Sequence, residues 1–175
     1  MAAPRRYVAL VRGINVGGRN ALPMARLREL CESVGCTDIS TYIQSGNVVF
    51  SSDRSRDELR AVLEEALASE LPTAPTVVVR TAAELEQVLA SNPFPQADPK
   101  SVHVAFAAEE VDPTGVETDE FLPDELAVRG ADVYLHLPNG LGRSKLAATL
   151  ERRVPCPVTV RNWRTVGKLA ELASG

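Results

Sequence analysis

Alternating and helix-spaced hydrophobic residues divide the chain into short strands and helices. In its first half, β-compatible runs bounded by glycine, proline or polar residues occupy residues 7–11, 39–43, 48–51 and 76–80. Between these runs, apolar residues recur at helical spacing in one stretch that begins near Pro23 and in a second that follows Ser55. The resulting order, strand–helix–strand–strand–helix–strand, is that of the ferredoxin-like βαββαβ fold.

The same order recurs further along the chain. Strands are expected at residues 102–107, 126–129, 133–137 and 157–160. A short acidic stretch over Asp112–Phe121 is expected to form the first helix of this half, and the second helix follows the glycines of residues 138–142. Asn162 is expected to cap a further helix at the end of the chain.

We therefore predict an α+β protein of two tandem ferredoxin-like (βαββαβ) halves, with an extra linking helix and a C-terminal helix. The predicted divisions are the first half at residues 1–81, the linking helix and Pro-rich connection at 82–99, and the second half with the C-terminal helix at 100–175. Two capping boxes mark helix starts. Ser55 pairs with Glu58 before the second helix, and Thr81 pairs with Glu84 before the linking helix.

Composition limits the class of protein. No apolar run approaches the roughly 18 residues that cross a bilayer, and the first apolar run is too short for a signal-peptide core. The three cysteines form no CxxC pair, and their odd number argues against a disulfide framework. Cys31 is expected to be buried on a helix face, whereas Cys36 and Cys156 lie near element ends and are expected to be partly exposed. We expect no membrane segment and a reducing, cytoplasmic location.

Charge is unevenly distributed along the chain. Residues 1–28 carry six arginines and no acidic residue, and residues 141–175 carry seven basic and two acidic residues. The intervening residues 29–140 hold six basic and twenty-one acidic residues, so the net charge is −4. If the two basic ends meet in the fold, they form an anion-attracting surface; otherwise the charges are dispersed over solvated faces.

The first candidate site is the glycine-rich stretch after the first strand. Glycine and asparagine allow positive φ angles and expose backbone donors, and the flanking arginines could hold an anion. We expect the turn after the second strand to lie close to it. The candidate ligand-binding residues here are Arg12, Asn15, Gly17, Gly18, Asn20, Gln44, Ser45 and Asn47. The alternative is a long connecting loop without a ligand.

The second candidate site precedes the next-to-last helix. Glycines allow a tight turn, and the helix that follows presents free N–H groups beside a hydroxyl and two cations. The candidate residues are Gly140, Gly142, Arg143, Ser144 and Lys145. Their spacing is not that of a Walker loop. The alternative is a hairpin-to-helix joint whose polar residues cap the helix.

The third candidate site is the basic cluster around the single tryptophan, with Arg161, Asn162 and Trp163 as its candidate ligand-binding residues. An exposed tryptophan beside arginine can stack on a base or another ring. Alternatively, Trp163 anchors the last helix to the body of the protein. We expect the three sites to share one surface.

Familiar catalytic constellations are missing from the sequence. His103 and His136 lie on predicted strands, which could bring them together on an open sheet face beside Tyr134. No HxH or HExxH spacing supports a metal, and no nucleophile–base pair is visible, so we expect no cofactor. An open sheet face would suit RNA, but aromatic residues make up only 5% of the chain, and the strands lack the aromatic RNP consensus.

Several blocks of sequence, in the right order, resemble the domain of unknown function 1697 family. They are RGINVGG at 12–18 with LPM at 22–24, TYIQSGNVVF at 41–50, NPFP at 92–95, PNGLGRSKL at 138–146 and RNWRTV at 161–166. The resemblance covers nearly the whole chain. It implies a bacterial soluble protein of two ferredoxin-like halves, in a family without an established activity from which catalytic residues could be carried over.

The function predicted from these observations is binding of an anionic ligand by the basic glycine-rich loops. The ligand would be a nucleotide, a phosphorylated metabolite or a nucleic-acid backbone. Two alternatives stay open: an enzyme acting on a phosphate-bearing substrate, and a protein-interaction module, which includes association into a homo-oligomer.

Overall fold

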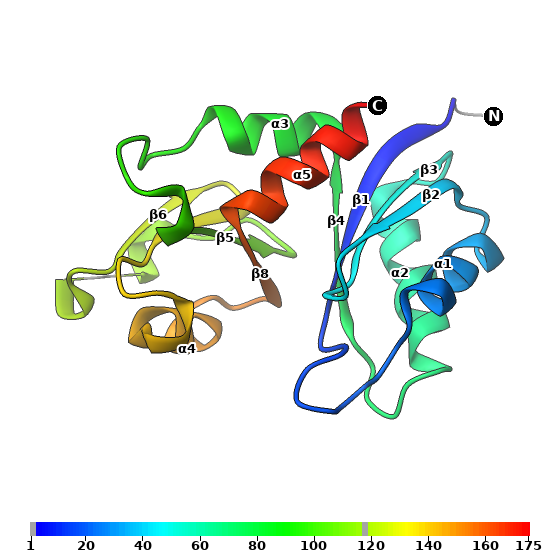
Figure 1. The fold of residues 1–175 in the computed structure, drawn as a ribbon, viewed down its shortest axis with the longest axis horizontal. Helices are drawn as coiled ribbons and strands as arrows, with labels where there is room; N and C mark the ends of the chain where they lie inside the picture. The colour runs from blue at the N-terminus through cyan, green and yellow to red at the C-terminus, as the bar shows by residue number, and fades with distance from the viewer. Residues whose placement is uncertain (1–2, 117–118) are drawn as a thin grey trace. The chain divides into compact units, whose positions relative to one another are not determined.

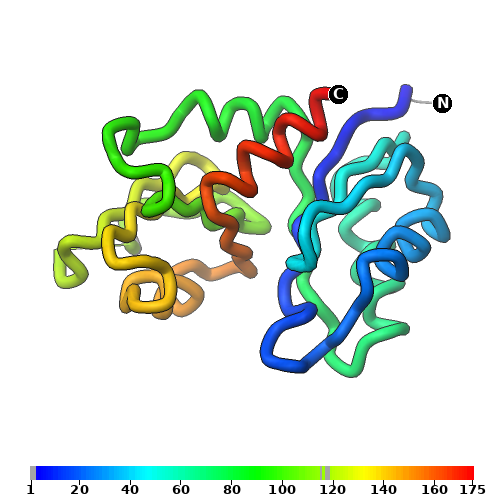
Figure 2. The backbone as a smooth tube through the Cα atoms, in the orientation of Figure 1, coloured from blue at the N-terminus to red at the C-terminus, as the bar shows by residue number. Residues whose placement is uncertain are grey.

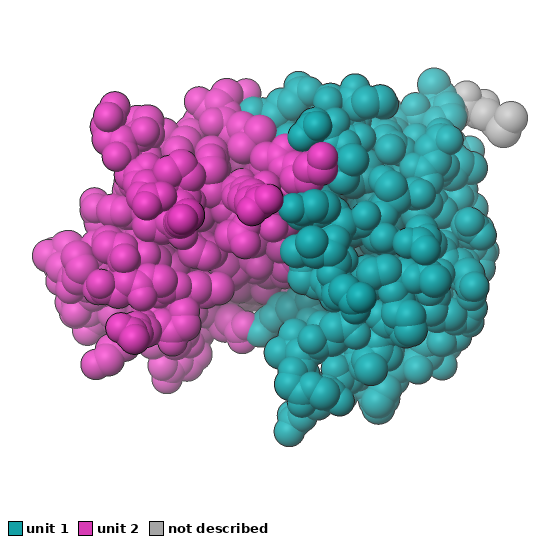
Figure 3. Space-filling view, in the orientation of Figure 1, with its two compact units in different colours: residues 1–86, 169–175 teal, residues 87–168 magenta. Residues whose placement is uncertain are grey.

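The computed structural model describes residues 3–116 and 119–175, and Figures 1 and 2 trace the path of the chain. The chain forms two compact units (Figure 3): unit 1 is Met1–Glu86 with Leu169–Gly175, and unit 2 is Gln87–Lys168. Each unit contains one four-stranded antiparallel sheet. Together with five α-helices among the described residues, these sheets confirm the predicted α+β class.

Unit 1 follows the predicted order of strands and helices. Its elements are β1 (Arg5–Arg12), α1 (Met24–Ser33), β2 (Thr37–Tyr42), β3 (Asn47–Ser52), α2 (Arg56–Ala68) and β4 (Thr76–Thr81). The sheet order is β2-β3-β1-β4, and the two helices lie against one face of it (Figure 1). Helix α3 (Ala82–Ala90) then leads into unit 2, and the division between the units falls within it.

Both predicted capping boxes form. The Ser55 hydroxyl accepts the Glu58 N–H while the Glu58 carboxylate accepts the Ser55 N–H at 2.8 Å. The same exchange links Thr81 and Glu84 at the start of α3, at 3.2 and 2.9 Å. Each box satisfies two backbone donors that have no partner within a helix, which explains why α2 and α3 begin where they do.

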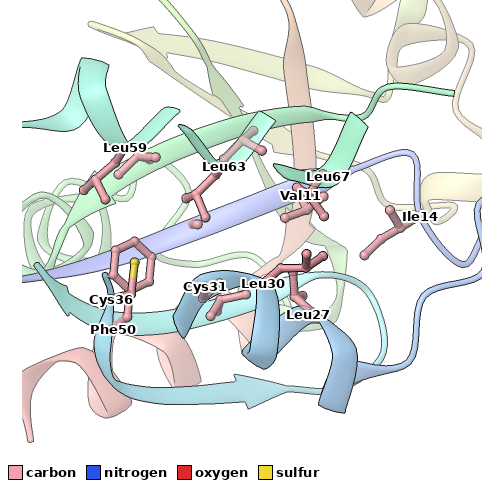
Figure 4. Packing of buried hydrophobic residues seen from close by; sticks show 14 of the residues in the cluster. Val11, Ile14, Leu27, Leu30, Cys31, Cys36, Phe50, Leu59, Leu63 and Leu67 are labelled. Atoms are coloured by element: carbon pink, nitrogen blue, oxygen red, sulfur yellow. The ribbon is translucent and has the colours of Figure 1, made fainter. Parts of the chain in front are cut away.

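The core of unit 1 lies between its sheet and its two helices (Figure 4). It is built from helix residues three or four positions apart and from alternate residues of the strands, including Val11, Leu27, Leu30, Phe50, Leu59, Leu63 and Leu67. This spacing places one face of each helix on the sheet. The helical periodicity in the sequence therefore identified the buried faces correctly.

Two of the three cysteines belong to this core. Cys31 is buried, as expected, but the expectation for Cys36 is wrong, because only 4% of its surface is exposed. Its N–H donates to the Cys31 carbonyl oxygen at 3.1 Å, which turns the chain back toward the core after α1. Burial raises the pKa of Cys31 to about 12 and that of Cys36 to about 11, so neither is a thiolate at neutral pH. Cys156 is partly exposed, as expected.

Unit 2 repeats the strand order with fewer helices. Its elements are β5 (Val102–Ala107), β6 (Glu125–Arg129), β7 (Asp132–His136), α4 (Lys145–Arg153) and β8 (Val158–Asn162), followed by α5 (Trp163–Ser174). The sheet order is β6-β7-β5-β8. A core of apolar residues joins α4 to one face of this sheet. The division between the units falls within α5.

The helix expected over Asp112–Phe121 is wrong for the part of that stretch that the structure describes. Two short 3₁₀ turns, Pro113–Gly115 and Asp119–Phe121, stand in its place; residues 117 and 118 lie outside the described part. The Asp112 carboxylate accepts the Thr114 N–H at 2.9 Å and so caps the first turn. Glycine and β-branched residues disfavour its continuation as an α-helix.

Among the described residues, the central strands β1 and β5 are buried along most of their length, whereas the edge strands β2 and β6 are partly exposed. In unit 1, successive residues of β1 point to opposite faces, yet Val8, Ala9 and Leu10 are all at most 1% exposed. In unit 2, Val104 and Ala105 are likewise fully buried. The central strands are thus covered on both sides. No helix within the described residues is long and apolar enough to cross a membrane.

Candidate functional site

The glycine-rich loop after β1 is held together by its own asparagines. The Asn15 amide donates to the carbonyl oxygens of Leu22 and Gln44, both at 2.9 Å, and its oxygen accepts the Leu22 N–H at 2.7 Å. The Asn20 amide donates to the Gly13 and Thr73 carbonyl oxygens at 2.9 and 2.8 Å. Both asparagines have positive φ angles, 54° and 48°. Their side chains thus supply hydrogen bonds to backbone groups that have no partner in a regular helix or sheet.

The predicted proximity of the turn after β2 to this loop is present. Asn15 bonds to Gln44, and the Val11 N–H donates to the Gly46 carbonyl oxygen at 2.8 Å. The Asn47 side chain is fully buried and donates to Ser45 Oγ at 2.9 Å. The polar groups of the glycine-rich loop and of the turn after β2 therefore hydrogen-bond largely to one another.

The exposed residues of this loop and turn include both glycines and apolar side chains. Gly17 and Gly18 are exposed at positive φ angles of 58° and 75°. Val16 and Ile43, at 66% and 52% exposure, are apolar. Arg12 is half-buried and has interactions within the chain. The glycine-rich loop is thus held by internal hydrogen bonds, and its exposed surface includes glycines and apolar side chains.

The second candidate block lies at the start of α4. The Ser144 hydroxyl accepts the Ala147 N–H at 2.9 Å and donates to Asp124 Oδ2 at 2.8 Å. Ser144 and Asp124 are both buried, at 6% and 7% exposure. Ser144 is thus used as a helix cap, with its proton engaged by a carboxylate. Arg143 and Lys145 beside it are exposed.

The third candidate block borders a half-open hollow within unit 2. We call it the Trp163 hollow; it has a volume of about 440 Å³ and is lined by Pro99, Lys100, His103, Asn162, Trp163 and Arg164. Asn162 and Trp163 were expected at a ligand site, and they lie together here. Volumes of about 300–1,000 Å³ are typical of small-molecule sites.

The pairing of β5 with β8 brings these residues together. The two strands are antiparallel, and His103 lies directly opposite Asn162, so the start of β5 meets the end of β8. A 3₁₀ turn, Pro99–Ser101, precedes β5 and is capped by the Asp98 carboxylate, which accepts the Lys100 N–H at 3.0 Å. The Asn162 side-chain oxygen accepts the Thr165 N–H at 2.8 Å, as expected for the cap of α5.

The lining of the Trp163 hollow carries two positive charges and no carboxylate. Neither the Lys100 ammonium nor the Arg164 guanidinium has a hydrogen bond or an ion pair to any residue in 3–116 or 119–175. Arg161 does not line the hollow; it lies on the opposite face of β8 and is only 9% exposed. Burial lowers the pKa of Arg161 to about 10, and its guanidinium donates to Thr159 Oγ1 at 2.7 Å.

Trp163 packs against another aromatic residue of unit 2 and also borders the hollow. Its ring packs against Tyr134, with centroids 6.5 Å apart and an interplanar angle of 46°. The Tyr134 hydroxyl in turn donates to the Val88 carbonyl oxygen at 2.7 Å. The indole is nevertheless only half-buried and forms part of the wall of the hollow. One side of Trp163 is therefore fixed by packing while another stays accessible.

His103 is the most buried polar side chain in this wall. It is 7% exposed, and its Nδ1 has no hydrogen-bond partner among the described residues. Burial lowers the pKa of His103 below its ordinary value, although a hydrogen bond with the Ser101 backbone acts in the opposite direction. The imidazole is therefore neutral at pH 7.

We expect the free energy of unfolding to fall as the pH drops below about 6.5, the ordinary pKa of histidine. Below that pH the unfolded chain takes up a proton that the buried His103 of the folded chain takes up only at lower pH. Thermal unfolding at a series of pH values measures this loss. The variant His103→Gln should show a shallower loss, whereas His136→Gln keeps the contribution of His103 and serves as the control. Parallel curves for wild type and His103→Gln would contradict the assignment.

The two histidines do not come together. His103 pairs with Leu135 and His136 with Val102 across β5 and β7, so the two rings are on opposite faces of the sheet. His136 Nδ1 lies 3.2 Å from Glu125 Oε1, and its ring is 5.5 Å from that of Phe94. It borders two other hollows, of about 420 and 360 Å³. In the part of the chain that is described, no three histidine, cysteine or acidic side chains are placed to hold a metal.

Of the predicted residues, the structure thus brings Asn162 and Trp163 to one hollow and Gly140 to the neighbouring 420 Å³ hollow, which shares Lys100 with it. Sequence reasoning missed Lys100 and His103 as site residues. The predicted strand order contained a signal for them, because it places the first and last strands of a half side by side and antiparallel. Residues just before the first strand then meet residues just after the last.

The structure and the sequence both resemble those of other proteins. A structure described as that of the conserved bacterial protein SP0830 from Streptococcus pneumoniae has 27% sequence identity and a TM-score of 0.79, covering 98% of this chain and 99% of that one. No curated protein matches the chain. The profile of a family described as "Protein of unknown function (DUF1697)" matches residues 5–134. Both the sequence blocks and this match therefore place the chain in one family: it belongs to DUF1697.

Proposed function

We propose that the protein binds an anionic small molecule in the Trp163 hollow. The observation that carries the proposal is the pair of unpartnered cations, Lys100 and Arg164, in a lining without a carboxylate. An anion placed between them gains two charge-assisted hydrogen bonds, which are about twice as strong as neutral ones. The low aromatic content and net charge of −4 favour a local site over a long nucleic-acid surface.

Loss of either cation is expected to weaken anion binding. The variants Lys100→Ala and Arg164→Ala should each raise the Kd for a phosphate-bearing ligand roughly ten- to hundred-fold, because a hydrogen bond to a charged group contributes about 1.5–3 kcal/mol. The probe is a panel of nucleotides and phosphorylated sugars, titrated by calorimetry. Trp163 is the only tryptophan of the chain, so its fluorescence reports binding at this hollow directly.

The matched controls are Arg143→Ala and Lys145→Ala. Both residues are exposed, carry the same charges and belong to the same unit, but they do not line the hollow. If these controls weaken binding as strongly as the hollow variants, the site lies at the start of α4 instead. If no member of the panel binds, the proposal fails. Release of inorganic phosphate from a bound ligand would favour the enzyme alternative over binding alone.

Two finer structural points belong to the same proposal. We infer that unit 1 has the ferredoxin-like topology and that unit 2 has its strand arrangement, with short 3₁₀ turns in the described part of the stretch where the first helix would lie; the strand orders β2-β3-β1-β4 and β6-β7-β5-β8 support this. A reducing, cytoplasmic location is supported by the two buried thiols and by the lack of a disulfide among the described cysteines.

A further inference from the structure

The Trp163 hollow presents more than positive charge. Its wall also contains the half-buried indole of Trp163, the carboxamide of Asn162 and the imidazole of His103. We infer that its ligand is a free mononucleotide, whose base stacks on Trp163 and whose phosphate contacts Lys100 and Arg164. This ligand assignment rests on the proposed function.

The indole supplies the surface for a planar ring. Base–aromatic stacking gains about 1–3 kcal/mol per base and tolerates any base, because every base has a π face. The contact of Trp163 with Tyr134 restrains the indole from one side, so little rotational freedom is lost when a base stacks on it. A sugar phosphate would leave this apolar surface uncovered.

The Asn162 carboxamide and the His103 imidazole are polar groups that can hydrogen-bond to the edge of a base. The Asn162 oxygen is used by the Thr165 N–H, and no contact occupies its amide Nδ2 within the described residues. His103 Nδ1 is buried without a partner, and such a nitrogen carries an unrecovered desolvation cost. We infer that a base edge bound in the hollow hydrogen-bonds to the His103 imidazole. Burial lowers the pKa of His103, so it adds a hydrogen-bonding group to the wall without adding a third positive charge at pH 7.

The size of the hollow favours one nucleotide. Its volume of about 440 Å³ is in the lower part of the range for small-molecule sites. Lys100 precedes β5 and Arg164 follows β8, and the antiparallel pairing of these two strands brings both residues to the hollow that His103 and Trp163 line. The charges and the ring surface therefore border the same small space, as a phosphate joined to a base through one sugar requires.

The test compares AMP, ribose 5-phosphate, inorganic phosphate and a four-residue single-stranded oligonucleotide on the unmodified protein by calorimetry. We expect AMP to bind at least tenfold more tightly than ribose 5-phosphate, and the oligonucleotide to bind no more than tenfold better than AMP. Equal affinity for AMP and ribose 5-phosphate overturns the nucleotide assignment and leaves the proposed function standing. An oligonucleotide that binds much more tightly overturns it in favour of nucleic acid. No binding by any of the four probes removes both proposals.

Variants of Trp163 test whether the base stacks on its indole ring. Trp163→Leu should weaken AMP binding at least tenfold while leaving the affinity for ribose 5-phosphate within about twofold, whereas Trp163→Phe should keep most of the AMP affinity because it keeps a π face. Equal losses for both ligands in Trp163→Leu would contradict stacking on this ring. Because the indole also packs on Tyr134, the melting temperature of each variant is measured first. The comparison of ligands on the unmodified protein decides the assignment if Trp163→Leu does not fold.

Discussion

Gly46→Ala is expected to lower the free energy of unfolding by about 2–4 kcal/mol. Gly46 has a φ angle of 84°, which costs a residue with a side chain about 1–2 kcal/mol. A Cβ atom there would also lie 2.8 Å from the Val11 carbonyl oxygen and 3.0 Å from the Ile14 side chain. That backbone cannot move away easily, because the Val11 N–H donates to the Gly46 carbonyl oxygen. Urea denaturation measures the change.

Gly17→Ala separates the cost of the clash from the cost of the backbone conformation. Gly17 also has a positive φ angle, 58°, but an added Cβ meets nothing within 4 Å. We expect it to cost about 1 kcal/mol or less, because the stiffer unfolded chain offsets part of the strain. If the two variants lose equal stability, the close approach of the turn after β2 to the glycine-rich loop does not matter energetically.

Ser144→Ala is expected to lower the free energy of unfolding by about 2–4 kcal/mol, although serine and alanine differ by one atom. The change removes the cap of α4, which contributes about 1 kcal/mol. It also leaves the buried Asp124 carboxylate without the hydroxyl that donates to it at 2.8 Å, and an unsatisfied buried acceptor costs about 1–3 kcal/mol. Thermal unfolding and urea denaturation both measure the loss.

The matched control is Ser55→Ala, which removes the cap of α2. Ser55 is exposed, and its partner Glu58 is exposed too, so only the capping contribution of about 1 kcal/mol should be lost. The double variant Asp124→Ala/Ser144→Ala should lose less than the sum of the two single changes, since the buried carboxylate is then gone. Equal losses for Ser144→Ala and Ser55→Ala would mean that the contact with Asp124 contributes nothing.

Local signals in the sequence predicted most elements of the fold. The capping boxes at Ser55 and Thr81 form as predicted because each depends on residues only three apart. The helix expected over Asp112–Phe121 did not form in its described part, since its apolar residues are few and Pro113 begins a 3₁₀ turn. The burial of Cys36 was missed because it depends on a backbone bond to Cys31 after the helix ends.

The hydrogen-bond partners of the candidate binding residues could be predicted less well from local sequence signals than the helices and strands. The asparagines at positions 15 and 20 were predicted as ligand groups from their exposed-looking glycine-rich context, but their amides bond to Gln44 and Thr73, which are far away in sequence. Likewise, the hydroxyl of Ser144 bonds to a carboxylate twenty residues earlier. Hydrogen-bond partners of this kind cannot be read from spacing, because they are chosen by the packing of distant segments.

The sequence alone determined the α+β class, the alternation of strands and helices, the buried helix faces and the helix starts. These features depend on hydrophobic periodicity and on side-chain-to-backbone bonds within one turn, which the order of residues specifies directly. Only the tertiary structure decided which polar groups are left without partners. The pairing of β5 with β8 brings Lys100 and His103 to Asn162 and Trp163, and that meeting joins parts of the chain about sixty residues apart, where no local pattern specifies contact.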